Sequence, residues 1–482
     1  MKLQRRDWTR VHNWLGVLIT PPLAVIVFTG IVLFFHDALN QWEFARAPQL
    51  SLGQAMDQAA QRLEEDGTLV AGGNLSFYPA EGQGFPLLVS AGKGYQAVLA
   101  DGTLVADAVH GSAGRALLEV HYALSLPMGI YLAGLVALLM LVLLMNGLVV
   151  HWPNLKRQWQ QYRGQSGKDR WLDLHKLVGV ATLPYLLMYA LTGAAFCLLV
   201  FYQALLLLGP YQGDRSAILA DMGFPQVPKA TGLPLAQGQL PPSILLAQSQ
   251  QLLGAQPNRL TIAPWQDQAQ QVITAASRGR ELIESQELRF VPGTDTPLES
   301  LTQDNMGPAR LVFDSFTALH YGHFGGQAIL WLFSLLGLGT LAMLFGGALR
   351  AQGRLVPGSA LYRWNRQGLV LAGSLPLGTL ALLLAGRYLP MDSALRYGAF
   401  PWIFWIATLA PVLWPLAKGQ GRKRVAWLWW SSGLLALVAI GSLLQKGLQG
   451  QLAWLVALAL GLGLLAWGGL KLTVRKVAVT RL

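Results

Sequence analysis

Histidines at matched positions are the residues with which this sequence could do chemistry. Two apolar segments, 12–30 and 175–193, agree without a gap: each begins with His, has Gly four residues and Pro nine residues later, and ends in Thr-Gly. Apolar helices in general need not agree at these residue types, so the agreement indicates an internal repeat that carries a paired site. The matched residues are His12, Gly16, Pro21, Thr29 and Gly30, and His175, Gly179, Pro184, Thr192 and Gly193.

A second pair of histidines matches in the same way. His121 and His320 are each followed by Tyr, and each opens the next apolar segment of its half. Pairing equivalent residues joins His12 with His175 and His121 with His320. Two neutral imidazoles that project inward from facing helices of a four-helix bundle are the ligands of a six-coordinate b-type haem. The four histidines therefore predict two non-covalent haems, with the iron of each held by one pair.

The other histidines at the ends of apolar segments have a weaker claim. A single His at a helix end is more often an interfacial residue or a hydrogen-bonded cap than a ligand, and it is the repeat that favours ligation. His36, His151 and His323 have no such match, so we regard them as alternative ligands or partners of haem propionates. Gly16 and Gly179, one turn beyond the first pair, would leave room for a flat macrocycle.

The single cysteine excludes three kinds of site. The chain has one cysteine, Cys197, so it can form no internal disulfide and cannot supply the several thiolates of an iron–sulfur cluster. A Cys-x-x-Cys-His motif is also missing, which rules out covalent attachment of a c-type haem.

Composition shows which elements must position these side chains. The sequence is 53% hydrophobic and only 12% charged, and it contains long apolar runs without charges. Because about 20 apolar residues cross a bilayer, we predict eight transmembrane helices. They fall near residues 13–35, 122–150, 177–209, 324–349, 368–386, 399–417, 426–445 and 452–470.

The distribution of Lys and Arg predicts the orientation. Basic residues collect before the first span and after every even-numbered span, whereas the short opposite loops hold few. The positive-inside rule therefore places both termini in the cytoplasm. This arrangement also explains the net charge of +12 by contact with anionic lipid, so we expect no nucleic-acid partner.

Two polar segments interrupt the spans, and both should face the outside. Each has a helical pattern, such as 51–66, followed by short alternating strands, which predicts two small α+β domains. Because spans one and three run in the same direction, the two halves should be parallel repeats. We divide the chain into a first span (1–37), an outside domain (38–120), a second span (121–152), a cytoplasmic loop (153–172), a third span (173–209), a second outside domain (210–319), a fourth span (320–350) and a four-span extension (351–482).

These motifs resemble a known family. The HNWLG and TG of the first span, HYALSLPMG of the second, DLHKLVG of the third and LHYGHFGG of the fourth resemble the PepSY-associated transmembrane proteins, over roughly residues 5 to 350. The outside segments resemble PepSY domains, which the orientation would place in the periplasm of a bacterial inner membrane. The expected fold is thus a mainly α polytopic membrane protein, with a haem-binding core in spans one to four and two PepSY-like domains.

The resemblance also implies a function. Characterised members are similar to haem-containing inner-membrane reductases that reduce ferric siderophores during iron uptake, and their span histidines match His12, His121, His175 and His320. The expected substrate is therefore a ferric siderophore or another ferric chelate. No G-x-G-x-x-G follows a strand, so electrons should come from a cytoplasmic reductase or from quinol. The last four spans depart from the shorter family members.

Two other functions compete with a reductase. The protein could be a non-enzymatic scaffold or regulator whose outside domains bind a peptide or a protease, with histidines that are only interfacial. It could also be a transporter, which parallel repeats and proline-broken helices favour, although the spans lack interior carboxylates or lysines for coupling.

Overall fold

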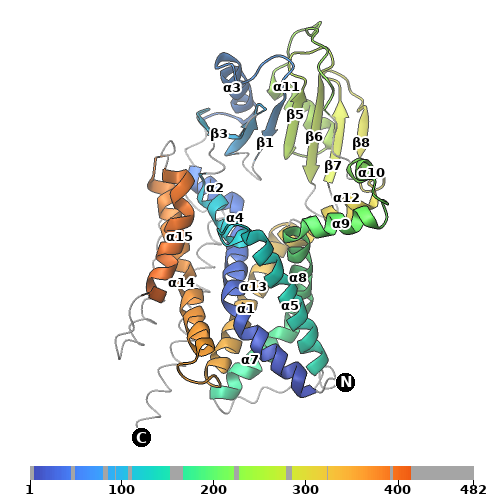
Figure 1. Ribbon diagram of the computed structural model, residues 1–482. Helices are drawn as coiled ribbons and strands as arrows, with labels where there is room; N and C mark the ends of the chain where they lie inside the picture. Colours follow the sequence, from blue (N-terminus) through green and yellow to red (C-terminus); the bar gives the residue numbers. More distant parts are fainter. Residues whose placement is uncertain are drawn as a thin grey trace.

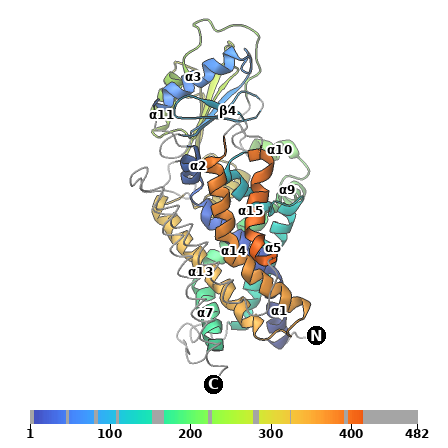
Figure 2. The same ribbon diagram turned by 90° about the vertical axis from the view of Figure 1, so that its left-hand side faces the viewer.

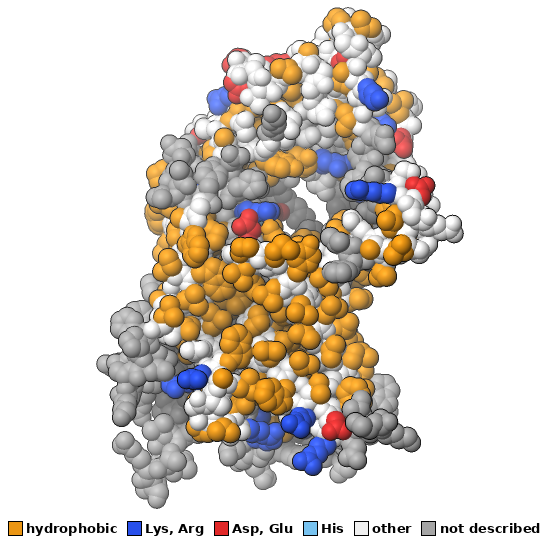
Figure 3. Space-filling model, in the orientation of Figure 1, with side chains coloured by type: hydrophobic (Ala, Val, Ile, Leu, Met, Phe, Trp, Pro, Cys, Tyr) orange, Lys and Arg blue, Asp and Glu red, His pale blue; other side chains and the backbone are white. Residues whose placement is uncertain are grey.

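The protein is a bundle of long helices that carries a β-sheet at one end (Figure 1). A computed structural model describes residues 5–44, 49–79, 85–92, 94–106, 111–151, 167–221, 227–277, 285–322, 324–390 and 395–413. Apolar side chains cover the middle of the bundle, and Lys and Arg side chains gather at the end farthest from the sheet (Figure 3). This distribution is typical of a protein that crosses a membrane.

Four helices of the described residues are long and apolar enough to cross a membrane. They are α1 (Arg5–Leu33), α5 (Gly129–His151), α13 (Gly326–Gln352) and α14 (Ala360–Tyr388). Helices α7 (Gly167–Ala181) and α8 (Leu183–Cys197) are together long and apolar enough for a fifth span. They meet at a bend of 70°, so this span would be a broken one. Pro184 lies in the first turn of α8, where it can start a helix but cannot continue one.

The prediction of eight spans is therefore supported only as far as the fifth. The sixth predicted span corresponds to α15 (Leu395–Leu413), whose apolar part, Gly398–Leu413, is shorter than the other spans. Residues after Leu413 lie outside the described part of the chain. The predicted spans at 426–445 and 452–470 lie outside the described residues.

Short helices connect the spans at the sheet end of the bundle. They are α2 (His36–Phe44), α4 (Ala113–Ala123), α9 (Leu199–Leu208), α10 (Arg215–Asp221) and α12 (Pro308–Tyr321). The sequence placed His121 and His320 at the start of two spans, but each lies in the last turn of a separate helix, α4 or α12. Both helices end because the next residue, Leu124 or Gly322, has a left-handed backbone.

The two polar segments form one continuous antiparallel sheet. The order of its eight strands is β4-β3-β2-β1-β5-β6-β7-β8. The first segment supplies β1 (Leu75–Tyr78), β2 (Leu87–Ser90), β3 (Gln96–Val98) and β4 (Leu104–Ala106); the second supplies β5 (Arg259–Ala263), β6 (Gln271–Ser277), β7 (Ser285–Phe290) and β8 (Glu299–Leu301). The expectation of two separate small domains is thus replaced by one joint domain.

The joint domain is held by pairing and by a shared core. Strand β1 pairs with β5, with Ser76 opposite Thr261, and the two hydroxyls lie 2.9 Å apart. Helices α3 (Leu52–Glu65) and α11 (Pro242–Leu253) contact each other and contribute side chains to one buried cluster with the sheet. Ser51 caps α3, as its sequence predicts. Each segment alone would leave a strand edge and half of this core in water.

Helices α14 and α15 run side by side along the bundle (Figures 1 and 2). Helix α1 remains a single helix despite Pro21 and Pro22, which cannot donate a hydrogen bond to the carbonyl four residues earlier. The indole N–H of Trp364 on α14 lies 3.2 Å from both of the carbonyl oxygens concerned, those of Val17 and Leu18. The predicted extension therefore completes the hydrogen bonding of the first span.

Candidate functional site

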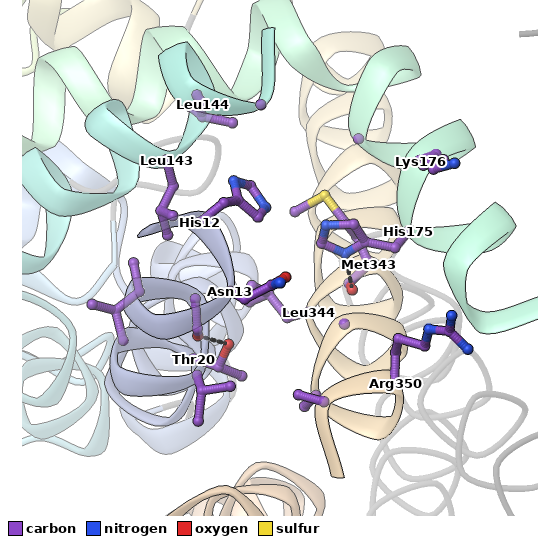
Figure 4. Close-up of a pocket in the computed structure, with 18 of the residues that line it drawn as sticks. His12, Asn13, Thr20, Leu143, Leu144, His175, Lys176, Met343, Leu344 and Arg350 are labelled. Atoms are coloured by element: carbon purple, nitrogen blue, oxygen red, sulfur yellow. Dashed lines mark hydrogen bonds between the residues drawn. The ribbon is translucent and has the colours of Figure 1, made fainter. Parts of the chain in front are cut away.

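His12 and His175 face each other at the end of the bundle away from the sheet. His12 projects from α1 and His175 from α7, and their ring centres lie 6.2 Å apart. Figure 4 shows both rings pointing into the same cavity from opposite sides. The cavity has a volume of about 590 Å³, within the range of roughly 300–1,000 Å³ that is usual for cofactor and ligand pockets. We call His12 and His175 the inner pair.

Backbone contacts orient the inner pair. Nδ1 of His175 lies 2.9 Å from the carbonyl oxygen of Met343. A carbonyl can only accept, so Nδ1 carries the hydrogen, and the lone pair of Nε2 is left for another partner. Nδ1 of His12 is buried without a hydrogen bond of ordinary geometry among the described residues, beside the backbone of Leu143. At least His175 is therefore in the tautomer that metal-binding histidines adopt.

Glycines on the neighbouring helices lie against both inner rings, and the one beside His175 leaves space that a larger side chain would fill. A Cβ atom on Gly147 of α5 would lie 3.5 Å from Cε1 of His12, and one on Gly347 of α13 would lie 3.0 Å from Nδ1 of His175. Helix α5 follows α1 in the first half, and α13 plays the same part for α7 in the second. The repeat thus places each inner histidine against a glycine of its own half.

His121 and His320 form a second pair, the outer pair, at the sheet end of the bundle. Their ring centres also lie 6.2 Å apart. Nδ1 of His121 lies 2.9 Å from the carbonyl oxygen of Ile26, and Nδ1 of His320 lies 2.8 Å from Oγ1 of Thr192. Because the Thr192 hydroxyl donates to Met188 at 2.8 Å, it accepts from the ring. Both outer rings therefore direct Nε2 away from these hydrogen bonds.

The Thr-Gly that closes each repeat is explained by the outer pair. Thr29 lies 3.4 Å from Nδ1 of His121, as Thr192 lies beside His320. A Cβ atom on Gly30 would lie 2.9 Å from Cε1 of His121, and one on Gly193 would lie 3.8 Å from the same atom of His320. The threonine provides a polar contact in both halves. Gly30 also gives space for the His121 ring, whereas the distance at Gly193 is that of an ordinary contact. The sequence revealed this motif but not which histidine it serves.

We expect Thr192→Val to weaken the outer site selectively. The substitution keeps the shape of the side chain but removes the acceptor of the His320 Nδ1–H. Loss of a hydrogen bond that orients a metal-binding histidine typically lowers metal affinity by about 10–100-fold. Spectral titration of the haem-free protein with haemin should therefore show one weakened site and one unchanged site. Equal affinity at both sites in the variant would contradict this role of Thr192.

The spacing of both pairs fits a six-coordinate iron. Two metal–nitrogen bonds of about 2 Å, together with the inner part of each ring, place two ligating imidazoles with their centres roughly 6 Å apart. Both observed separations, 6.2 Å, agree with this value. Gly16 fits as well, because a Cβ atom there would meet nothing within 4 Å. Gly179 also lines the cavity, but the space beside it is taken by Met343, whose Sδ would lie 3.2 Å from a Cβ atom there. The four histidines, Gly16 and the cavity are therefore compatible with haem.

The remaining sequence-predicted residues lie elsewhere or beside the pairs. His151 lines the cavity of the inner pair. His36 contacts Asn40 and Asp37 on its own helix, and it packs where Gly114 leaves space for it. His323 lies outside the described residues. The structure therefore gives His36 a local packing role and leaves His151 as a neighbour of the inner site.

Sequence reasoning missed the polar residues around the inner cavity. Asn13 points into it in Figure 4, and Lys176, Arg350 and Arg354 also line it. The sequence reasoning interpreted Arg350 and Arg354 only as determinants of orientation and did not consider Lys176. Their positions suit an anionic ligand, such as a cofactor with carboxylates. Asn13 directly follows His12, which is the signal that could have found it.

Comparison with known proteins places the chain in a family. Residues 9–350 match the PepSY-associated TM region. The chain therefore belongs to the PepSY-associated transmembrane family, and it is a multi-pass membrane protein. It is also similar to an uncharacterized protein of Pseudomonas aeruginosa, with 28% identity over 343 residues that cover 63% of this chain and 82% of the relative. The match ends at residue 350, before α14.

Proposed function

We propose that the protein is a transmembrane oxidoreductase that holds two b-type haems and passes electrons to a ferric chelate. The observation that carries the proposal is the repeated pair of facing imidazoles, each with ring centres 6.2 Å apart. His12 and His175 would hold one haem, and His121 and His320 the other. When bound, the haems would supply one-electron redox chemistry.

The arrangement along the bundle supports a route across the membrane. The inner pair lies near the start of α1 and on α7, at the end of the bundle where basic side chains gather, and the outer pair lies on α4 and α12, near the sheet (Figures 1 and 3). By the positive-inside rule, the first end is cytoplasmic and the sheet is periplasmic in a bacterial inner membrane. Electrons from a cytoplasmic reductase or from quinol would enter at the inner pair and leave at the outer pair.

A ferric siderophore or another ferric chelate is the substrate that we favour. One electron converts Fe(III) to Fe(II), and hard oxygen ligands hold Fe(II) less firmly, so reduction promotes release of the metal. Figure 3 shows a hollow between the sheet and the helical bundle, beside charged side chains. This hollow lies on the side of the outer pair and offers a place where a chelate could approach.

The reaction is tested by reoxidation of the reduced protein. The purified protein is reduced with dithionite, freed of excess reductant, and mixed with a panel of ferric chelates in a stopped-flow spectrometer. We expect the absorption bands of the reduced haems to disappear as the haems are reoxidised. A ferrous indicator should report one Fe(II) for each electron that the protein loses. Haem that is reoxidised by oxygen but by no ferric chelate would contradict the proposed substrate class.

Gly16 offers a test of whether a macrocycle fills the inner cavity. We expect Gly16→Leu to leave the haem-free protein folded, because the added side chain enters open space, but to lower the haem content from two to one per chain. Gly398→Leu is the matched control, because a Cβ atom on this helical glycine also meets nothing within 4 Å, and Gly398 does not line the cavity. Pyridine haemochrome assays provide the measurement. Full haem content in Gly16→Leu would place the inner haem elsewhere.

A further inference from the structure

A buried ion pair joins the C-terminal helices to the core of the bundle. Nη1 of Arg396 on α15 lies 2.8 Å from Oε1 of Glu43 on α2, and the two side chains are 3% and 1% exposed. Removal of two charges from water is costly unless each finds further hydrogen bonds. Removal of either partner would leave the other charge buried without compensation.

Arg396 is fully satisfied. Its guanidinium group has five N–H donors, and five contacts to acceptors surround it. The acceptors are the Glu43 carboxylate and the backbone carbonyls of Gly111, Gly386, Leu389 and Pro390. Gly111 lies just before α4, and the last three lie at the end of α14 or directly after it. One side chain thus connects α2, α14, α15 and the approach to α4.

Glu43 continues this connection to the helix that carries His121. Its second oxygen, Oε2, accepts from the backbone N–H of Ala113 at 2.8 Å, and Ala113 is the first residue of α4. A carboxylate is favourable at a helix N-terminus because it faces unpaired N–H groups and the positive end of the helix dipole. Burial raises the pKa of Glu43, while the Ala113 N–H and Arg396 oppose that rise. His121 lies in the last turn of the same helix.

Close packing leaves this connection little freedom. A Cβ atom on Gly386 of α14 would lie 3.0 Å from the Glu43 carboxylate carbon and 3.1 Å from Cβ of Ala113. Helix α14 therefore contacts both ends of the Glu43–Ala113 hydrogen bond. A shift of α14 or α15 would be transmitted to the start of α4.

The second half of the chain shows a related arrangement. Oδ2 of Asp221 accepts from the backbone N–H of Ala309 at 2.8 Å, near the start of α12, and the hydroxyl of Tyr211 donates to the same carboxylate oxygen. Helix α12 carries His320 in its last turn. In both halves a carboxylate from a connecting helix thus binds the start of the helix that presents an outer histidine. Among these described contacts, only the first half uses a residue from beyond position 350.

We infer that Arg396 and Glu43 are positioning residues for the outer haem site, through α4 and His121. The inference rests on the proposed function, because it concerns a site that the outer pair would form. It gives the C-terminal helices a role: they set the position of one outer ligand and so tune the reduction potential of the outer haem. The hydrogen bonds that Arg396 and Glu43 make within the described part of the chain involve neither His12 nor His175.

The test is a redox titration of the full-length protein that carries Arg396→Gln or Glu43→Gln. The outer haem signal is identified as the one that His320→Ala lacks. We expect both variants to shift the midpoint potential of the outer haem and to alter its low-spin electron paramagnetic resonance signal, while the inner signal stays unchanged. Hydrogen–deuterium exchange of residues 113–123 should also become faster. Arg366→Gln, which removes an exposed charge on α14, is the matched control and should change neither.

Several outcomes would overturn the inference. The inference is wrong if the midpoint potential of the outer haem stays the same in both variants. It is equally wrong if hydrogen–deuterium exchange in α4 becomes faster without any change in that potential. If Arg396→Gln fails to fold, Glu43→Gln decides the question, because it preserves the size of the side chain. Wild-type protein without haem would contradict the proposed function. Two haems in the wild-type protein, with an outer midpoint potential that neither substitution changes, would contradict only the positioning role.

Discussion

Replacing His175 by alanine is expected to remove the inner haem and leave the outer haem in place. The substitution deletes one of two facing imidazoles, and His12 alone cannot form a six-coordinate site. The purified variant should contain one haem per chain. Dithionite should still reduce that haem, and a ferric chelate should still reoxidise it. Electrons supplied from the cytoplasmic side of inverted membrane vesicles should no longer reach it.

His151→Ala is the control for this result. His151 lines the same cavity, but it has no matching histidine in the second half of the repeat, so the variant should retain both haems. Loss of the inner haem from His151→Ala, with His12 dispensable, would show that the inner ligands are paired differently. Haem content and the rate of reduction from the cytoplasmic side are the two measurements.

His320→Ala should have the opposite effect. The ring of His320 faces His121 and is held by Thr192, and aromatic side chains pack around it, with Tyr189 at 5.1 Å and Phe196 at 5.3 Å between ring centres. Its loss should remove the outer haem while the inner haem remains reducible from the cytoplasmic side. The rate of reoxidation by ferric chelates should fall to the background rate, because the exit on the sheet side is gone.

His36→Ala provides the comparison on the sheet side. His36 is a half-exposed histidine that contacts residues of its own helix, and both haems should survive its replacement. A variant of His320 that keeps two haems and normal reoxidation would refute the outer pairing. The same would hold if His36→Ala lost a haem.

The sequence predicted which histidines lie together, but it did not predict the short helices that carry the outer pair. Because the two halves repeat in register, equivalent histidines had to lie at equal depth, and the structure brings together the pairs that this predicts. That these pairs bind haem stays a prediction. The separate helices α4 and α12 were not predicted, because left-handed residues such as Leu124 and Ser125 interrupt an otherwise apolar stretch. The residue types of Leu124 and Ser125 do not predict the end of α4, whereas Gly322, at the end of α12, is the type of residue that commonly ends a helix in this way.

Contacts between residues far apart in the chain account for the other differences between the predicted and the observed structure. The alternation of apolar residues predicted the strands, but it could not show that β1 would pair with β5, because alternation fixes the face of a strand and not its neighbour. Arg396 was interpreted as a charge in an outside loop. Its burial depends on Glu43, which lies more than three hundred residues earlier in the chain. Similarly, Trp364 compensates for the prolines of α1 from a distant helix.

The central claim, that two histidine pairs hold two b-type haems, is tested most directly on the detergent-purified wild-type protein from cells supplied with haem. The measurement is a pyridine haemochrome assay together with a dithionite-reduced minus oxidised spectrum. We expect b-type bands and two haems per chain, falling to one in His175→Ala or His320→Ala and to none in the double variant. A spectrum without b-type bands, from protein that is folded and intact, would contradict the claim.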